Sequence, residues 1–222
     1  MNSVNAIVES TAAATEEGSL PAPSSPSGRS LSGEKAQRII DAMRRSVARR
    51  GTAGSTFDHV SREAGVSRGL LHYYFGTKEQ LLLEAVRRDC ELRLERLEGQ
   101  LTTAGSADDF VDLMAQNLRT NLRDEPEYLT LIFELFTLSR RNTEIAAEYA
   151  ALMRRTREQL AAMLGLAQRE GIVRLHAEPE SIAEVLFSLA DGLALRMLSE
   201  PERDFSEAVR AGIACARALL TD

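Results

Sequence analysis

The sequence predicts an all-α chain built from nine helices. From Glu34 onward, apolar residues recur every three or four positions, for example at Ile39, Ile40, Met43 and Val47, which is the spacing of an amphipathic helix. No stretch alternates apolar and polar residues between turn signals, so we expect no strands. Glycine, proline and short polar clusters interrupt the helical pattern at 51–55, 65–67, 76–77, 99–106, 124–126, 141–143, 171–179 and 200–204.

The composition excludes several classes of protein. The chain has 222 residues, of which 44% are hydrophobic and 27% charged, and this suits one or two folded domains. The apolar segment 182–198 is interrupted by Glu184, Asp191 and Arg196, whereas a membrane span needs roughly 20 apolar residues, so we expect no membrane association. The N-terminus lacks the pattern of a secretory signal, and two distant cysteines do not predict a disulfide framework. We therefore expect a cytoplasmic protein.

The net charge of −6 is unevenly distributed along the chain. Residues 34–88 contain 11 Lys and Arg against 6 Asp and Glu, whereas residues 89–222 contain 15 against 24. A basic segment followed by an acidic one is typical of a small DNA-binding module attached to a larger domain that does not contact phosphate.

Residues 1–33 are rich in Ser, Ala, Thr, Pro and Gly and are predicted to form a disordered N-terminal arm. Arg29 is the only basic residue of this arm, so an inert arm is favoured over one that contacts DNA.

The segment 55–74 has the pattern of a helix-turn-helix motif within a predicted DNA-binding domain at 34–80. Thr56 is placed to cap the second helix, Gly65 can adopt the positive φ that ends it, and Ser67 is placed to cap the third. A linker helix is predicted at 78–98, where Thr77 and Gln80 have the spacing of a capping box.

The short third helix carries the candidate DNA-reading residues. Arg68 at its start can reach guanine O6 and N7 in the major groove, Gly69 allows close approach of the backbone, and Leu70 can touch a thymine methyl. Polar tips and one cation suited to phosphate contacts are provided by Thr56, Ser67, His72, Tyr73, Tyr74 and Lys78.

Three of these residues have competing interpretations. DNA contact is favoured over core packing for Tyr73, because two tyrosines beside Phe75 cannot all face inward on a short helix. Tyr74 is equally compatible with DNA contact and packing. His72 is equally compatible with a phosphate contact and with a neutral surface histidine.

The segment 34–90 closely resembles the TetR/AcrR family of transcriptional regulators, whose signature contains Thr, then Ala-Gly-Val-Ser, an aromatic pair, Phe and Lys-Glu. Here these are Thr56, 64–67, 73–74, Phe75 and 78–79. The resemblance implies that the first three helices bind DNA, that the fourth joins them to the core, and that residues 99–222 bind an effector and dimerise.

Two positions depart from the family pattern. His72 stands where tyrosine is usual, which puts its phosphate contact in doubt, and Ser61 replaces a common alanine without breaking the fold.

The last two helices, predicted at 180–199 and 205–220, have the features of a helical interface. The second has one apolar stripe and small residues over much of its remaining surface, which permits close helix approach. In the resembled family these helices form a four-helix dimer bundle, and 191–193 resembles a recurring family sequence. A homodimer would place two recognition helices about 34–36 Å apart on a near-palindromic DNA operator.

An effector pocket is expected among the three helices between 107 and 170, because the family has one there. The candidate pocket residues are Phe110, Met114, Asn117, Leu131, Glu134, Met153 and, from the following helix, Phe187. For any one of these, simple core packing is the favoured interpretation, since Met and Phe at helical spacing usually fill space. The sequence does not identify the small-molecule effector.

These observations predict a DNA-binding repressor without a cofactor. An all-helical enzyme is disfavoured because the three histidines lack metal-ligand spacing, no glycine-rich phosphate loop is present and no catalytic set stands out, so neither catalytic nor metal-binding residues are expected. A ligand-independent activator or an architectural DNA-binding protein would have the same sequence features. Repression is favoured over these by resemblance alone.

Overall fold

A computed structural model describes residues 33–123 and 126–221, so the predicted arm lies outside the described residues apart from Gly33. Within these ranges the chain forms nine helices and no strand, which confirms the all-α prediction. The helices are α2 (Gly33–Gly54), α3 (Phe57–Ala64), α4 (Arg68–Phe75), α5 (Lys78–Leu101), α6 (Ala107–Arg123), α7 (Pro126–Ser139), α8 (Thr143–Arg169), α9 (Pro179–Ser199) and α10 (Ser206–Leu220). None of them combines the length and apolarity needed to span a bilayer.

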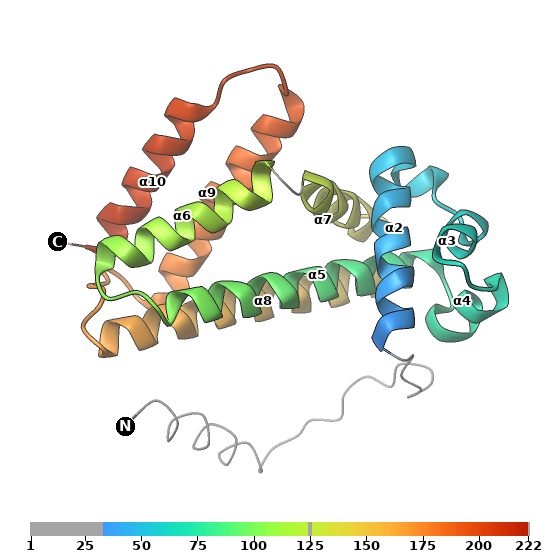
Figure 1. The fold of residues 1–222 in the computed structure, drawn as a ribbon, viewed down its shortest axis with the longest axis horizontal. Coiled ribbons are helices and arrows are strands. Elements are labelled where there is room, and N and C mark those ends of the chain that lie inside the picture. Colours follow the sequence, from blue (N-terminus) through green and yellow to red (C-terminus); the bar gives the residue numbers. More distant parts are fainter. Residues whose placement is uncertain (1–32, 124–125, 222) are drawn as a thin grey trace, which may run out of the picture. The chain divides into compact units, whose positions relative to one another are not determined.

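The helices form two groups joined by α5 and α7 (Figure 1). Helices α2, α3 and α4 pack together, and α2 also contacts α5 and α7. The long helices α5 and α8 run side by side, and α6, α9 and α10 pack at the end of this pair that is remote from α2, α3 and α4. Helix α7 therefore contacts both the α2–α4 group and the helices of the C-terminal group.

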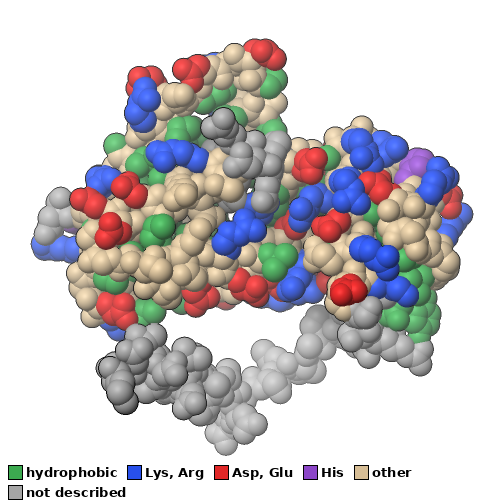
Figure 2. Space-filling view, in the orientation of Figure 1, with side chains coloured by type: hydrophobic (Ala, Val, Ile, Leu, Met, Phe, Trp, Pro, Cys, Tyr) green, Lys and Arg blue, Asp and Glu red, His purple; other side chains and the backbone are tan. Residues whose placement is uncertain are grey.

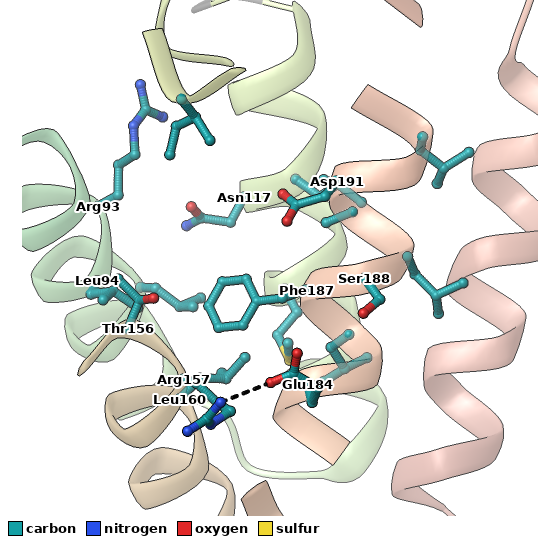
Figure 3. A pocket seen from close by; sticks show the side chains of 18 of the residues that line it. Arg93, Leu94, Asn117, Thr156, Arg157, Leu160, Glu184, Phe187, Ser188 and Asp191 are labelled. Carbon is teal, nitrogen blue, oxygen red and sulfur yellow. Dashed lines mark hydrogen bonds and ion pairs between the residues drawn. The ribbon is translucent and has the colours of Figure 1, made fainter. Parts of the chain in front are cut away.

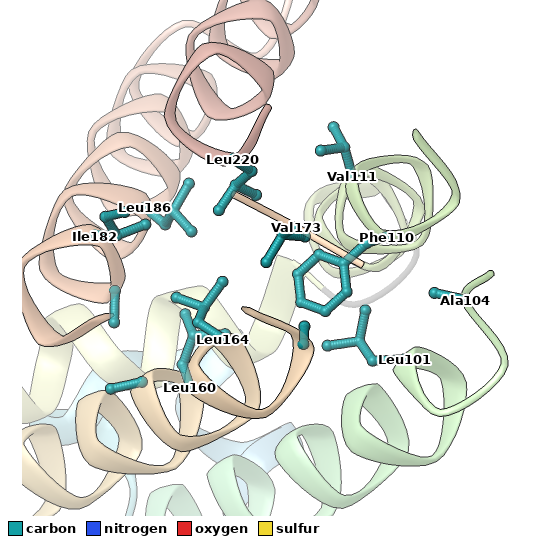
Figure 4. Packing of buried hydrophobic residues seen from close by; sticks show 13 residues of the cluster. Leu101, Ala104, Phe110, Val111, Leu160, Leu164, Val173, Ile182, Leu186 and Leu220 are labelled. Carbon is teal, nitrogen blue, oxygen red and sulfur yellow. The ribbon is translucent and has the colours of Figure 1, made fainter. Parts of the chain in front are cut away.

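The C-terminal group is held by an apolar core (Figure 4). Phe110 of α6, Leu164 of α8 and Leu220 of α10 meet there and are almost fully buried. Leu101 belongs to the same cluster. Its burial explains why α5 continues to Leu101 rather than ending at 98 as predicted, because apolar contact outweighs the modest helix penalty of Gly99.

The link between α2 and α3 is organised by buried serines. Gly51 leaves the helical conformation with φ 65° and ψ 175°. The Ser46 hydroxyl donates to Ser55 Oγ at 3.0 Å, and Ser55 Oγ donates to the Gly51 carbonyl at 2.8 Å. Both serines are fully buried, so this chain of hydrogen bonds satisfies polar groups that water does not reach.

We expect Ser55→Ala to lower the free energy of unfolding by about 1–3 kcal/mol, because it leaves the Ser46 hydroxyl and the Gly51 carbonyl buried without this partner. Urea denaturation measures the change. The double variant Ser46→Ala/Ser55→Ala should cost less than the sum of the single variants, since both partners are then removed. A loss below about 0.5 kcal/mol would show that the serines are not a structural unit.

Candidate functional site

The helix-turn-helix has the local structure that its sequence predicts. Thr56 Oγ1 accepts a hydrogen bond from the His59 amide, and Ser67 Oγ accepts one from the Leu70 amide, both at 3.3 Å. Gly65 ends α3 with φ 66°, a left-handed conformation that glycine adopts without strain. The predicted caps of the second and third helices are therefore confirmed, and α4 begins at Arg68 as a two-turn helix.

Arg68 is exposed and lies between an acid and a histidine. Its Nη1 is 3.3 Å from Asp58 Oδ1, and its Nε donates to His72 Nε2 at 3.3 Å. The other ring nitrogen of His72, Nδ1, lies 3.4 Å from the Gly76 carbonyl. Neither contact buries the guanidinium, so it remains accessible to a base edge.

The other side chains of α4 differ in exposure. Tyr73 is 48% exposed and meets half-buried Tyr74 edge-on, with ring centroids 5.1 Å apart. His72 is exposed and packs edge-on against Phe57. An added Cβ at Gly69 would meet no atom within 4 Å, so this face of α4 is open to close approach. Leu70 is half-buried.

Lys78, the first residue of α5, is half-buried, and its ammonium donates to the Thr52 carbonyl at 3.0 Å. This contact uses one of the three ammonium protons. All nine predicted DNA-contacting residues thus lie on α4, at the N-caps of α3 and α4, or at the start of α5.

Basic side chains are visible over the α2–α4 group in Figure 2, and some of them are already paired. Arg45 and Arg49 of α2 both bind the Glu63 carboxylate, at 2.7 and 2.6 Å. Burial acts to raise the pKa of Glu63, but the hydrogen bonds from the two arginines lower it overall. Glu63 therefore offsets part of the positive charge near the DNA-binding motif.

A cavity of about 460 Å³ lies in the C-terminal group, between helices α5 to α10 (Figure 3). This is within the usual range of small-molecule sites, and most of its lining is apolar. Four of the seven predicted pocket residues line it, namely Met114, Asn117, Met153 and Phe187.

The other three predicted pocket residues do not line the cavity. Phe110 is 2% exposed and packs in the apolar core, and Leu131 is fully buried among the helices. Glu134 lies on another face of α7, where its Oε2 accepts a hydrogen bond from Thr52 Oγ1 at 2.7 Å. The assignment of these three residues to the pocket lining is corrected accordingly.

The cavity contains a carboxylate that the pocket prediction missed. Asp191 of α9 faces the cavity opposite Asn117 (Figure 3). Surrounding protein atoms and, secondarily, the nearby Glu184 raise the pKa of Asp191, and no cation contributes to lowering it. Although protein atoms surround it in this way, Asp191 is exposed to solvent.

Two aromatic rings, those of Tyr149 and Phe136, line the same cavity as Asp191. Burial and, secondarily, the charge of Asp191 raise the pKa of Tyr149 to about 12. The Tyr149 and Phe136 rings have centroids 6.3 Å apart, and Phe136 is half exposed. Asp191 interrupts the apolar segment 182–198, and this interruption is the sequence signal that could have identified it.

The charges elsewhere in the cavity are compensated. Glu184 binds Arg157 at 3.2 Å, as drawn in Figure 3. The Arg93 guanidinium lies 3.8 Å above the Tyr128 ring. Among the lining carboxylates of the described chain, Asp191 is thus the one without a cation within ion-pair distance.

A largely buried ion pair joins α5, which lines the cavity, to α2. Asp89 of α5 is 2% exposed and binds Arg44 of α2. Burial raises the pKa of Asp89, and the charges of Arg44 and Arg93 oppose this shift. Next to it, burial raises the pKa of the Cys90 thiol to about 11, and its sulfur lies 3.3 Å from the Tyr128 hydroxyl. Cys90 is therefore a protonated thiol at neutral pH.

Comparison with family models identifies both parts of the chain. Residues 39–85 match the model of bacterial regulatory proteins of the TetR family. Residues 107–221 match the model of the BetI-type transcriptional repressor C-terminal region.

Individual proteins agree with these matches. The HTH-type transcriptional regulator BetI of Agrobacterium fabrum is 30% identical over 190 residues, which is 83% of each chain. A transcriptional regulator from Saccharomonospora viridis, solved in complex with choline, aligns with a TM-score of 0.66 and 24% identity over 84% of this chain and 95% of that one. A TetR-family regulator from Rhodococcus aligns with a TM-score of 0.71 and 23% identity over 86% and 100% of the two chains. Both structures share the fold. The chain belongs to the TetR family of bacterial transcriptional regulators, and its C-terminal region is of the BetI repressor type.

Proposed function

We propose that this protein is a dimeric, cytoplasmic repressor that leaves a near-palindromic operator when a small organic cation of the quaternary-ammonium type occupies its cavity. Residues 34–80 form the DNA-binding domain, and residues 99–222 form the domain for effector binding and dimerisation. The observation that carries the effector class is Asp191, a carboxylate without a cation at ion-pair distance, which lines the same cavity as the Tyr149 and Phe136 rings.

The DNA contacts divide into two kinds. Arg68 reads a guanine, with Gly69 admitting the DNA backbone and Leu70 at the edge of the contact. Phosphates are held by Thr56, Ser67, Tyr73 and Lys78, and His72 and Tyr74 are the weaker candidates. The accessible guanidinium of Arg68 and the open face at Gly69 support this division.

The dimer uses the outer faces of α9 and α10. Val185, Leu195 and Leu198 of α9 are between 37% and 50% exposed, and exposed apolar patches mark protein–protein interaction sites. Four small apolar residues are exposed at helical spacing along α10, which permits another helix to approach closely; these are Ala208, Ala211, Ala214 and Ala218. A two-fold axis beside these helices would bury both surfaces.

The effector class follows from the chemistry of the cavity. A quaternary ammonium ion cannot donate hydrogen bonds, so it is recognised by aromatic faces and a carboxylate. Asp191, Tyr149 and Phe136 provide this combination, and the rest of the lining is largely apolar. The choline bound to the Saccharomonospora viridis regulator supports the same class.

A competition gel-shift at controlled salt tests the proposal. We expect the protein to bind one class of genomic fragments at least about a thousandfold more tightly than random DNA, with two protomers per operator. Choline chloride should release the protein, whereas sodium chloride at the same concentration should release less. Equal release by the two salts would contradict the effector class, and no preference among fragments would contradict operator binding.

A further inference from the structure

Helix α7 separates the effector cavity from the DNA-binding group. Ile132, Phe133 and Phe136 line the cavity, whereas Glu134 contacts the α2–α3 link. Successive helical residues point about 100° apart, so Phe133 and Glu134 project in different directions although they are neighbours in sequence. One helix therefore contacts both the effector site and the DNA-binding group.

The Glu134 carboxylate is fitted to the end of α2. Its Oε2 accepts the 2.7 Å hydrogen bond from Thr52 Oγ1, and its Oε1 lies 3.6 Å from the position of a Cβ at Gly51. Gly51 is the residue at which the chain leaves the helical conformation. Glu134 thus holds the polypeptide at the point where it turns from α2 toward α3.

Thr52 continues the connection to Lys78. While its hydroxyl binds Glu134, its carbonyl accepts the Lys78 ammonium at 3.0 Å. Lys78 begins α5 directly after Thr77, which caps that helix. A displacement of Thr52 therefore changes where the Lys78 ammonium is held.

We propose that Glu134 is a positioning residue for DNA binding: through Thr52 it sets the location of the Lys78 ammonium, so a displacement of α7 at the cavity changes the grip on DNA phosphate. The inference rests on the proposed function, since it assumes that Lys78 meets a phosphate of the operator. It assigns Glu134 a role outside the effector pocket.

Operator binding by the full-length, effector-free protein provides the test, measured by fluorescence anisotropy at several salt concentrations. Thr52→Val and Glu134→Leu remove the hydrogen bond from opposite sides, and each should weaken binding about three- to tenfold per half-site, the range for one hydrogen bond. Glu134→Gln retains an amide oxygen that can accept from Thr52 and should restore most of the affinity. Thr137→Val on the same helix, whose hydroxyl bonds to the Phe133 carbonyl and to no other group of the described residues, is the matched control and should bind like wild type.

Two further readouts separate positioning from general stability. Thr52→Val should add little to a Lys78→Ala variant, and it should reduce the slope of log affinity against log salt, because a phosphate contact is weakened. The inference would be overturned if the affinity losses of Thr52→Val and Lys78→Ala multiplied in the double variant. It would also be overturned if Thr52→Val lowered the affinity without changing the salt slope. If Glu134→Leu binds an operator as tightly as the wild-type protein does, the inference about Glu134 fails but the proposed function stands. If the wild-type protein itself shows no preference for any operator, the proposed function fails as well.

Discussion

Arg68→Ala is expected to remove most of the discrimination between operator and random DNA while leaving weak, salt-sensitive binding. A bidentate arginine–guanine contact contributes about 1–3 kcal/mol of discrimination, so two contacts in a dimer contribute about 2–6 kcal/mol. The phosphate contacts are not altered by this change, and they supply binding that does not depend on sequence. The ratio of operator to random-DNA affinity, measured by competition at fixed salt, should fall at least about 30-fold.

Two controls make this result specific. Lys78→Ala should weaken binding to operator and random DNA alike and reduce the salt slope by about one per contact. Because Arg68 is paired with Asp58, its removal also leaves an unpaired carboxylate near DNA. The double variant Arg68→Ala/Asp58→Asn removes that charge and should regain overall affinity without regaining discrimination. Retained discrimination in Arg68→Ala would show that another residue reads the operator.

The DNA-binding motif could be predicted from sequence because its determinants are local. Thr56 and Ser67 cap their helices by bonding to amides three residues later, and Gly65 ends a helix through its own φ. These interactions depend on sequence spacing rather than on distant parts of the chain. The pairing of Arg68 with Asp58 was not anticipated, since it depends on the angle between α3 and α4.

The cavity was predicted only in part because its lining depends on how helices are rotated. Met114 and Met153 line the cavity, whereas Leu131 and Glu134 do not. Rotating α7 about its axis by about 100°, the angle between successive residues, would change which side chains line the cavity. Helical periodicity shows which residues share a face but not which other helix that face packs against. Asp191 was visible as an acid within an apolar segment, yet assigning it to a site required the positions of Tyr149 and Phe136.

Asp191→Asn is expected to weaken choline binding by about 2–4 kcal/mol, which is roughly 30- to 1,000-fold, because it removes the charge that attracts a partly desolvated cation. Isothermal titration calorimetry measures the loss. Glu184→Gln is the matched control: its carboxylate is already paired with Arg157, so its effect on choline should be much smaller. Equal losses in the two variants would show that the cation does not bind next to Asp191.

The raised pKa of Asp191 adds a dependence on pH that separates a binding role from a structural one. A cation favours the ionised carboxylate, so choline affinity should be full above the raised pKa and decrease as the pH falls through it, and Asp191→Asn should abolish this dependence.

The pH dependence of folding stability that Asp191 contributes has the opposite sign. A carboxyl whose pKa is higher in the folded state than in the unfolded state contributes stability at low pH, which is lost as the pH rises through the folded-state value. Asp191→Asn should therefore raise the melting temperature at neutral pH while it weakens choline binding. The reason is that an ionised carboxylate held in the cavity for a ligand lowers the stability of the effector-free protein. A variant that loses both stability and choline binding would instead indicate that Asp191 supports the fold.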